Sequence, residues 1–227
     1  MRKPWCTLAC ALALVCVAAA NVSPYSHYYT DGSAPTVMSW RHRLIRVRLS
    51  TSLRKPPPNI KEGSDVEGAA LRSLRRWEEA AGIRFAAEWT DEQSASAGER
   101  GDGVSLITVA DTRDNVSLFA GETIGYTKLF YNLRTGEIVE GDIAVSPRQK
   151  FSTDGSPGTY DLEATLTHEV GHLLGLDHSE ARRAVMREEQ LINGPSRPQT
   201  STGRTLSADD RAGIQALYGP PSGSRLS

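Results

Sequence analysis

One run of eleven residues constrains this chain more than any other feature: His-Glu-Val-Gly-His-Leu-Leu-Gly-Leu-Asp-His, at residues 168–178. Residues four apart on a helix lie nearly above one another, so His168 and His172 can direct their imidazoles at one metal ion. Gly175 follows within one turn. Because glycine tolerates positive φ, the chain can leave the helix there and bring His178 back as a third ligand. The run therefore predicts a three-histidine metal site at the end of a helix.

Three neutral imidazoles leave one position of a tetrahedral zinc ion open for water, which is the pattern of catalytic zinc and not of structural zinc. Glu169 lies beside the first ligand, where its carboxylate can reach that water without binding the metal. We therefore expect one catalytic zinc ion, with Glu169 as the general base of a hydrolytic reaction. The alternative is a stripe of surface histidines, but it does not explain why three of the chain's five histidines fall at ligand spacing.

The first twenty residues have the layout of an export signal. Two basic residues precede an apolar stretch over residues 6–19, and three alanines at 18–20 provide the small residues that a signal peptidase requires. The three cysteines of the chain all fall inside this segment, so we expect a secreted protein without disulfides. It would be extracellular, or periplasmic in a Gram-negative host. A buried N-terminal helix and a lipid anchor on Cys16 are the alternatives.

The patterning predicts four parts: a signal peptide over 1–20, a short leader or propeptide over 21–40, a catalytic domain over 41–219 and a loose tail over 220–227. Alternating apolar residues favour a strand at 44–49, and further strands are expected at 83–88 and 104–109. Two more, at 125–131 and 138–145, flank a hairpin-type connection. Helical spacing favours helices at 66–81, 162–174 and 208–219, the first ended by Gly82. This order predicts an α+β fold, in which a twisted mixed sheet of about five strands has two backing helices and a C-terminal helix.

The run at 168–178 resembles the metzincin signature His-Glu-x-x-His-x-x-Gly-x-x-His. Ser179, directly after the third histidine, makes the run similar to that of the matrixins, the matrix metalloproteinase-like family. Met186 follows at the distance of the methionine turn that lies beneath the zinc in that family. Residues 206–219 resemble its C-terminal helix, whose Asp209-Asp210 pair would connect the helix to the methionine turn. The resemblance implies a zincin-like catalytic domain.

The same resemblance implies a function. It indicates a secreted zinc-dependent endopeptidase that cuts internal bonds of protein or peptide substrates, which would lie extended along the strand at 125–131. We expect a monomer. The formal net charge of −1 offers no attraction for nucleic acid, and no segment is expected to stay in a membrane once the signal is removed.

The chain departs from the family at its accessory metal sites. Animal matrixins bind a second, structural zinc through histidines, but residues 141–145 read Gly-Asp-Ile-Ala-Val where one of those histidines is expected. We therefore expect a single zinc ion. Calcium sites are common in the family, and Asp111, Asp114 and Asp142 are candidate ligands. The alternative is that these aspartates are solvated turn residues.

The chain also departs from the family in the residues that could keep its proenzyme inactive. The family's cysteine switch is excluded here, since no cysteine is expected to remain after export. Other metzincins block their zinc with an aspartate, which makes Asp31 a candidate latency residue. An ordinary turn aspartate is the alternative.

Two rival functions stay open at this point. One is a catalytically silent, zinc-binding secreted interaction protein, against which the intact Glu169 argues. The other is a different hydrolase built on His-Glu-x-x-His, which the positions of Gly175, His178 and Met186 disfavour. A casein cleavage assay with and without a zinc chelator separates these functions.

Overall fold

Five strands form one mixed sheet on which the rest of the chain is built. The computed structural model describes residues 24–96, 101–190, 192–194 and 203–221, so the predicted signal peptide lies outside the described residues. The helices are α1 (Val66–Ala80), α2 (Arg113–Ser117), α3 (Leu162–Leu173) and α4 (Ala208–Tyr218), with a 3-10 turn η1 (Thr51–Leu53). The strands are β1 (Ser26–His27), β2 (Leu44–Ser50), β3 (Arg84–Thr90), β4 (Leu106–Thr108), β5 (Gly125–Tyr131), β6 (Ile138–Val145), β7 (Phe151–Ser152), β8 (Tyr160–Asp161) and β9 (Leu176–Asp177).

The main sheet has the strand order β3-β2-β4-β6-β5, and β5 is its antiparallel edge strand. Alternation along β2 explains why this segment is a strand, since Ile45, Val47 and Leu49 are each 1% exposed and the residues between them face solvent. The expected α+β architecture with a five-stranded mixed sheet is therefore confirmed.

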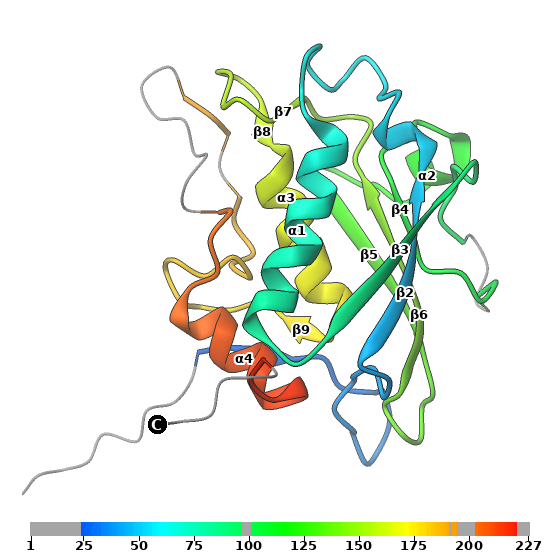
Figure 1. Ribbon diagram of the computed structural model, residues 1–227, viewed down its shortest axis with the longest axis vertical. Coiled ribbons are helices and arrows are strands. Elements are labelled where there is room, and N and C mark those ends of the chain that lie inside the picture. The colour runs from blue at the N-terminus through cyan, green and yellow to red at the C-terminus, as the bar shows by residue number, and fades with distance from the viewer. Residues whose placement is uncertain (1–23, 97–100, 191, 195–202, 222–227) are drawn as a thin grey trace, which may run out of the picture.

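Two long helices, α1 and α3, lie side by side on one face of this sheet (Figure 1). Asp65 caps α1 by accepting a hydrogen bond from the Gly68 amide at 3.0 Å. Trp77 is fully buried between the two helices, and its Nε1 donates to the Thr167 carbonyl at 2.9 Å. This packing fixes α3, which carries the first two predicted metal ligands.

The structure differs from the predicted elements at two places. β4 is shorter than predicted, and α2 was missed because five residues give too little periodicity to detect. Helix α1 ends at Ala80, with Ala81 as its extended C-cap, so its end lies just before Gly82 as predicted. Gly82 is not among the positive-φ glycines, so it does not end the helix in a left-handed conformation. Gly82 instead allows close packing, since an added Cβ would lie 3.1 Å from the Pro220 carbonyl oxygen.

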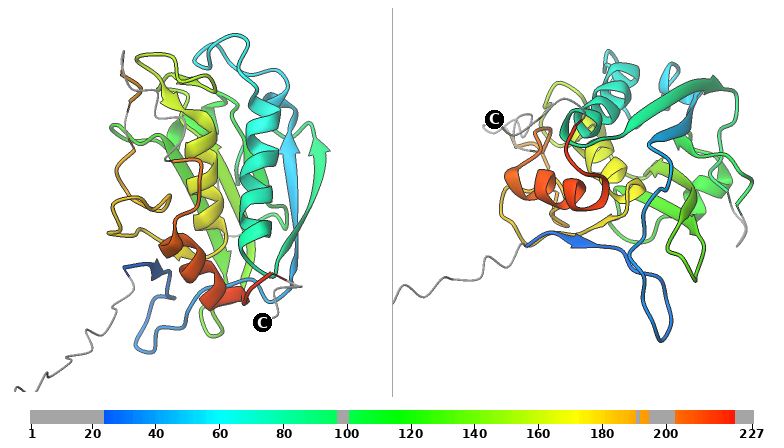
Figure 2. Two further views of the ribbon diagram at one scale, coloured as in Figure 1. Left: turned by 60° about the vertical axis from the view of Figure 1, so that its left-hand side comes forward. Right: turned by 60° about the horizontal axis from the view of Figure 1, so that its bottom comes forward.

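Residues 24–40 cross the domain below α3 and beside α4 (Figure 2). β1 pairs antiparallel with β9, Tyr29 pairs with Val37, and Met38 is 4% exposed. The segment predicted as a leader is thus packed against the domain over its described part. Its removal on maturation stays a prediction. In the part of the chain that the structure describes, no helix is long and apolar enough to cross a membrane.

Candidate metal centre and active site

The helix α3 and the turn that follows it position the three histidines. Asp161 caps the first turn by accepting from the Ala164 amide at 3.0 Å. The helix ends at Leu173, and Gly175 adopts a φ of 95°, in the left-handed region. An added Cβ at Gly175 would lie 2.4 Å from the Met38 carbonyl oxygen, so a side chain there would collide with backbone. The glycine therefore serves both the turn and the approach of the N-terminal segment.

His168, His172 and His178 come together, with one ring nitrogen of each lying within 4.8 Å of the others. Nδ1 of His168 lies 2.8 Å from the Val185 carbonyl oxygen, and Nδ1 of His172 lies 2.8 Å from that of Leu176. A carbonyl oxygen only accepts, so each Nδ1 carries the hydrogen and each Nε2 keeps its lone pair.

The donor set fits zinc. Nε2 of His172 and Nε2 of His178 lie 3.2 Å apart. Two nitrogens that bind one tetrahedral zinc at about 2.0–2.1 Å are separated by about 3.3 Å. Burial lowers the pKa of His168 to about 4, and it lowers the pKa of His172 well below its usual range. Both imidazoles are therefore neutral at physiological pH, as metal binding requires.

Glu169 lies next to this centre and is 4% exposed. Its carboxylate accepts a hydrogen bond of 2.6 Å from the Thr127 hydroxyl on β5. Burial raises the pKa of Glu169 to about 7, and the Thr127 hydrogen bond opposes that rise. A carboxyl whose pKa lies near neutrality can both take up and release a proton, which is what a general base and acid must do.

The methionine turn packs beneath α3. Met186 is 2% exposed, and an added Cβ at Gly171 would lie 2.2 Å from its sulfur. Gly171 is thus the helix position that makes room for the methionine, which the spacing of the histidines did not reveal. The Asp210 carboxylate accepts from the Val185 amide at 2.9 Å and from the Met186 amide at 3.1 Å. Asp210 therefore connects α4 to this turn.

Asp209 makes a different connection. Its carboxylate accepts from the Ser179 hydroxyl at 2.6 Å and from the Tyr25 amide at 3.0 Å. The first aspartate of the pair thus links α4 to the residue after the third histidine and to the N-terminal segment. The two adjacent carboxylates hold both ends of the loop that follows His178.

A cleft of about 500 Å³ lies against the metal centre. It runs between β5 and the segment after Met186. Its lining consists of Tyr28, residues 122–127, Tyr160, the three histidines, Glu169 and residues 188–190. Gly125 and Thr127 reach it from the edge strand of the sheet.

Tyr28 is a site residue that the sequence did not indicate. Its hydroxyl lies 3.0 Å from Nδ1 of His172, and burial raises its pKa. The single Nδ1 hydrogen is directed at the nearer Leu176 carbonyl oxygen, and the Tyr28 hydroxyl lies beside that hydrogen bond. Tyr28 and His172 are 144 positions apart, so no local pattern could have paired them.

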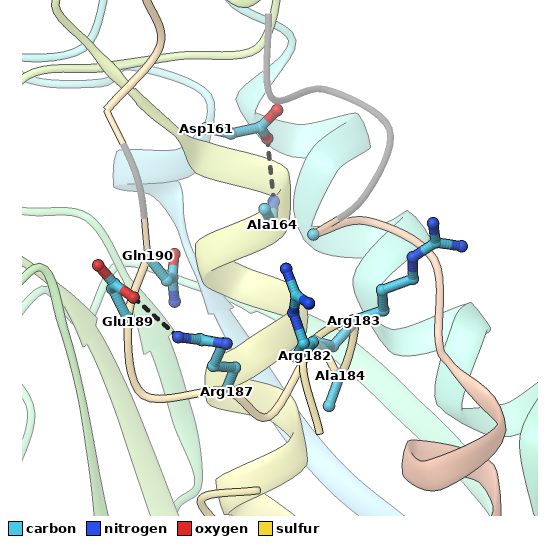
Figure 3. Close-up of a pocket in the computed structure, with 10 residues that line it drawn as sticks. Asp161, Ala164, Arg182, Arg183, Ala184, Arg187, Glu189 and Gln190 are labelled. Carbon is cyan, nitrogen blue, oxygen red and sulfur yellow. Dashed lines mark hydrogen bonds and ion pairs between the residues drawn. The ribbon is translucent and has the colours of Figure 1, made fainter. Parts of the chain in front are cut away.

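A second pocket, of about 310 Å³, adjoins the cleft and shares Glu189 and Gln190 with it (Figure 3). Arg182, Arg183 and Arg187 also line it, and Arg187 pairs with Glu189 at 3.0 Å. None of the three histidines lines this second pocket. The cleft is therefore the candidate active site.

Asp31 lies in an exposed turn, where its carboxylate accepts a 3.1 Å hydrogen bond from the Tyr131 hydroxyl. It does not line the cleft. Its role in latency stays a prediction.

The candidate calcium ligands do not gather into one group. Among the described residues, the three histidines are the one cluster of His, Cys, Asp and Glu with metal-binding spacing. Asp111 and Asp114 are exposed, but the alternative that Asp142 is a solvated turn residue was wrong, since it lies in β6 and is 1% exposed. Its two oxygens accept from the amides of Ser96 at 2.7 Å and Leu106 at 2.9 Å.

As the pH rises, the free energy of unfolding of the wild type should fall relative to that of the Asp142→Asn variant. Burial raises the pKa of Asp142 from 3.8 to about 6, and the negative charge of Glu140 adds to the rise. A raised carboxyl pKa contributes stability that is present below the unfolded pKa and is lost as the pH rises through the folded one. The free energy of unfolding of the wild type minus that of the variant should fall by about 2 kcal/mol between pH 4.5 and pH 7.5. Urea denaturation measures this difference, and a constant difference would contradict it.

Comparison with known proteins places the chain in a family. The matrixin family profile matches residues 39–219, so this chain belongs to the matrixin family. Metalloendoproteinase 1-MMP of Arabidopsis thaliana is 34% identical over 170 residues, covering 71% of this chain and 40% of that protein. Stromelysin-1 of Equus caballus is 29% identical over 205 residues, covering 90% and 37%. Interstitial collagenase of Oryctolagus cuniculus is 28% identical over 178 residues, covering 78% and 33%. The chain spans 40% or less of the length of these three relatives.

Proposed function

We propose that this protein is a zinc-dependent endopeptidase with His168, His172 and His178 as metal ligands and Glu169 as general base. The observation that carries the proposal is the joint orientation of these four side chains. Two ligand imidazoles are oriented by backbone carbonyls, and Glu169 lines the same cleft. The printed names of the relatives, a metalloendoproteinase, a stromelysin and a collagenase, support a peptidase.

Zinc bound by the imidazoles would supply a Lewis acid that polarises the scissile carbonyl and acidifies a water molecule. The chain's own residues would then move the protons. Glu169 accepts a proton from the attacking water at a carboxylate oxygen and delivers it to the nitrogen of the leaving amine. The low exposure of Glu169 keeps bulk solvent from competing for that proton.

The substrate would bind in extended form along β5. This strand is an edge of the main sheet, and an edge strand can hydrogen-bond a further strand through its backbone. Gly125, at the start of β5, lines the cleft beside Glu169. A protein or peptide chain paired with β5 would therefore present its backbone to the metal centre. We also propose that the enzyme is secreted and acts as a monomer on such substrates, with one zinc ion. The family resemblance suggests calcium as a structural ion.

Cleavage of casein by the purified protein tests this function. Activity should fall to background after treatment with a zinc chelator, because the bound metal, and not the imidazoles that hold it, would polarise the scissile carbonyl. Adding back about one equivalent of zinc should restore activity. A peptide with blocked termini should be cut at an internal bond, which distinguishes an endopeptidase from an exopeptidase. Zinc binding at one ion per chain without any cleavage would instead support a silent binding protein.

A further inference from the structure

The carboxylate of Glu169 is held by the edge strand opposite α3. The Thr127 Oγ1 lies 2.6 Å from Oε2 of Glu169 and 3.1 Å from the backbone oxygen of the same residue. No other side-chain hydrogen bond to Glu169 occurs within the described part of the chain. The glutamate and the threonine are 42 residues apart, so tertiary packing alone brings them together.

The Thr127 hydroxyl has one hydrogen to donate, and the two acceptors are unequal. The carboxylate oxygen is the nearer one, and a bond to an ionised acceptor is stronger than a bond to a neutral carbonyl. The hydrogen is therefore directed at Oε2. This leaves Oε1 with both of its lone pairs available for a proton in transit, whereas one lone pair of Oε2 is already engaged.

Gly125 places Oε1. Gly125 and Thr127 are two residues apart on β5, so they face the same side of the sheet. An added Cβ at Gly125 would lie 2.3 Å from Oε1, so only glycine leaves the oxygen its position. Oε1 therefore lies against the β5 backbone at the cleft, while Oε2 is occupied by Thr127.

We propose that Thr127 is a positioning residue for the general base: it fixes the Glu169 carboxylate so that Oε1 is the oxygen that accepts and returns the proton. This inference rests on the function proposed above. Without the hydroxyl, the carboxylate can rotate about its last torsion and sample orientations in which neither oxygen is aligned with the attacking water. Loss of alignment reduces the rate of the chemical step and leaves substrate binding largely unchanged.

Three variants test the proposal. Thr127→Val keeps the shape and removes the hydroxyl, and it should lower kcat about 10- to 100-fold with KM within about twofold of wild type. Thr127→Ser keeps the hydroxyl and should restore kcat to within a few-fold of wild type. Thr90→Val is the matched control, because Thr90 is a half-buried threonine on the other edge strand, β3. It should leave kcat and KM unchanged.

Two further readouts separate positioning from a merely structural role. In a Glu169→Ala background, Thr127→Val should cause no further loss of the residual rate, since the side chain it positions is gone. A crystal structure of zinc-loaded Thr127→Val should show the Glu169 carboxylate rotated or in more than one orientation. If Thr127→Val does not fold, Thr127→Ala compared with Thr127→Ser tests the same hydroxyl.

The outcomes distinguish this proposal from the one on which it rests. An inactive wild-type protein would overturn both. An active wild type with an unchanged kcat in Thr127→Val would overturn the role of Thr127 alone. A wild-type-like Glu169 orientation in the zinc-loaded variant would do the same. Loss of activity in Thr127→Ser equal to that in Thr127→Val would also overturn it, because the hydroxyl would then not be the group that matters.

Discussion

Replacing Glu169 with alanine should lower the kcat for peptide hydrolysis by about 10²- to 10⁴-fold, which is the usual contribution of general acid–base catalysis. The protein should keep its fold and its zinc. Glu169 is not one of the three clustered metal-ligand candidates. Its carboxylate accepts a hydrogen bond from the Thr127 hydroxyl and caps no helix. Removing it therefore deletes the proposed proton carrier and leaves the three candidate metal ligands in place.

Cleavage of a fluorogenic peptide and zinc content per chain, measured on the same sample, check this expectation. Glu79→Ala is a suitable control, because Glu79 is an exposed glutamate on a helix, outside the cleft. It should match the wild type in both measurements. If Glu169→Ala keeps more than about a tenth of the wild-type kcat, another group carries the proton and the assignment is wrong.

Replacing Asp210 with alanine should lower the free energy of unfolding by roughly 3 to 5 kcal/mol. Asp210 is 1% exposed and accepts from three backbone amides: those of Val185, Met186 and Ser207. The variant loses the capping box of α4, and it leaves the buried amides of the methionine turn without an acceptor.

The same variant should bind zinc more weakly. Val185 donates its amide to Asp210 and accepts from Nδ1 of His168 through its carbonyl, so the carboxylate and the imidazole share one residue. When the turn moves, the orientation of His168 is no longer fixed, and such outer contacts are worth about 10- to 100-fold in metal affinity.

Urea denaturation and zinc titration measure the two effects. Asp209→Ala is the comparison, because Asp209 is half-buried and bonds the Ser179 hydroxyl and the Tyr25 amide instead of the methionine turn. It should cost about 1 kcal/mol and leave zinc affinity close to that of the wild type. Equal losses in the two aspartate variants would show that the connection to the turn is not what stabilises the site.

Much of the metal centre was predictable because its determinants are local. The spacing of His168 and His172 follows from helix geometry, and Gly175 is needed at a turn that the sequence itself marks. The strand β2 was also predictable, since alternation along it reflects one buried face. The bounds of β5 and β6 match the prediction too, although β6 is buried along almost its whole length.

The remaining site residues depend on contacts between distant segments. Thr127 reads as an ordinary strand residue, and only the packing of α3 against β5 shows that its hydroxyl meets Glu169. Asp142 likewise lies in a segment that the sequence predicts as a strand, but no pattern shows that its carboxylate is buried. Its burial follows from the amides of Ser96 and Leu106, which come to it from elsewhere in the chain. Alternation and spacing carry no information about such partners.

The contact between Asp210 and the methionine turn also sets when the site can be completed. A ribosome makes the three histidines and the methionine before it makes Asp210, and domains generally fold as units. A nascent chain that ends before α4 has all three proposed metal ligands but lacks the carboxylate that fixes the turn beneath them. The fully ordered centre therefore arises late in synthesis, when nearly the whole domain is available to enclose it.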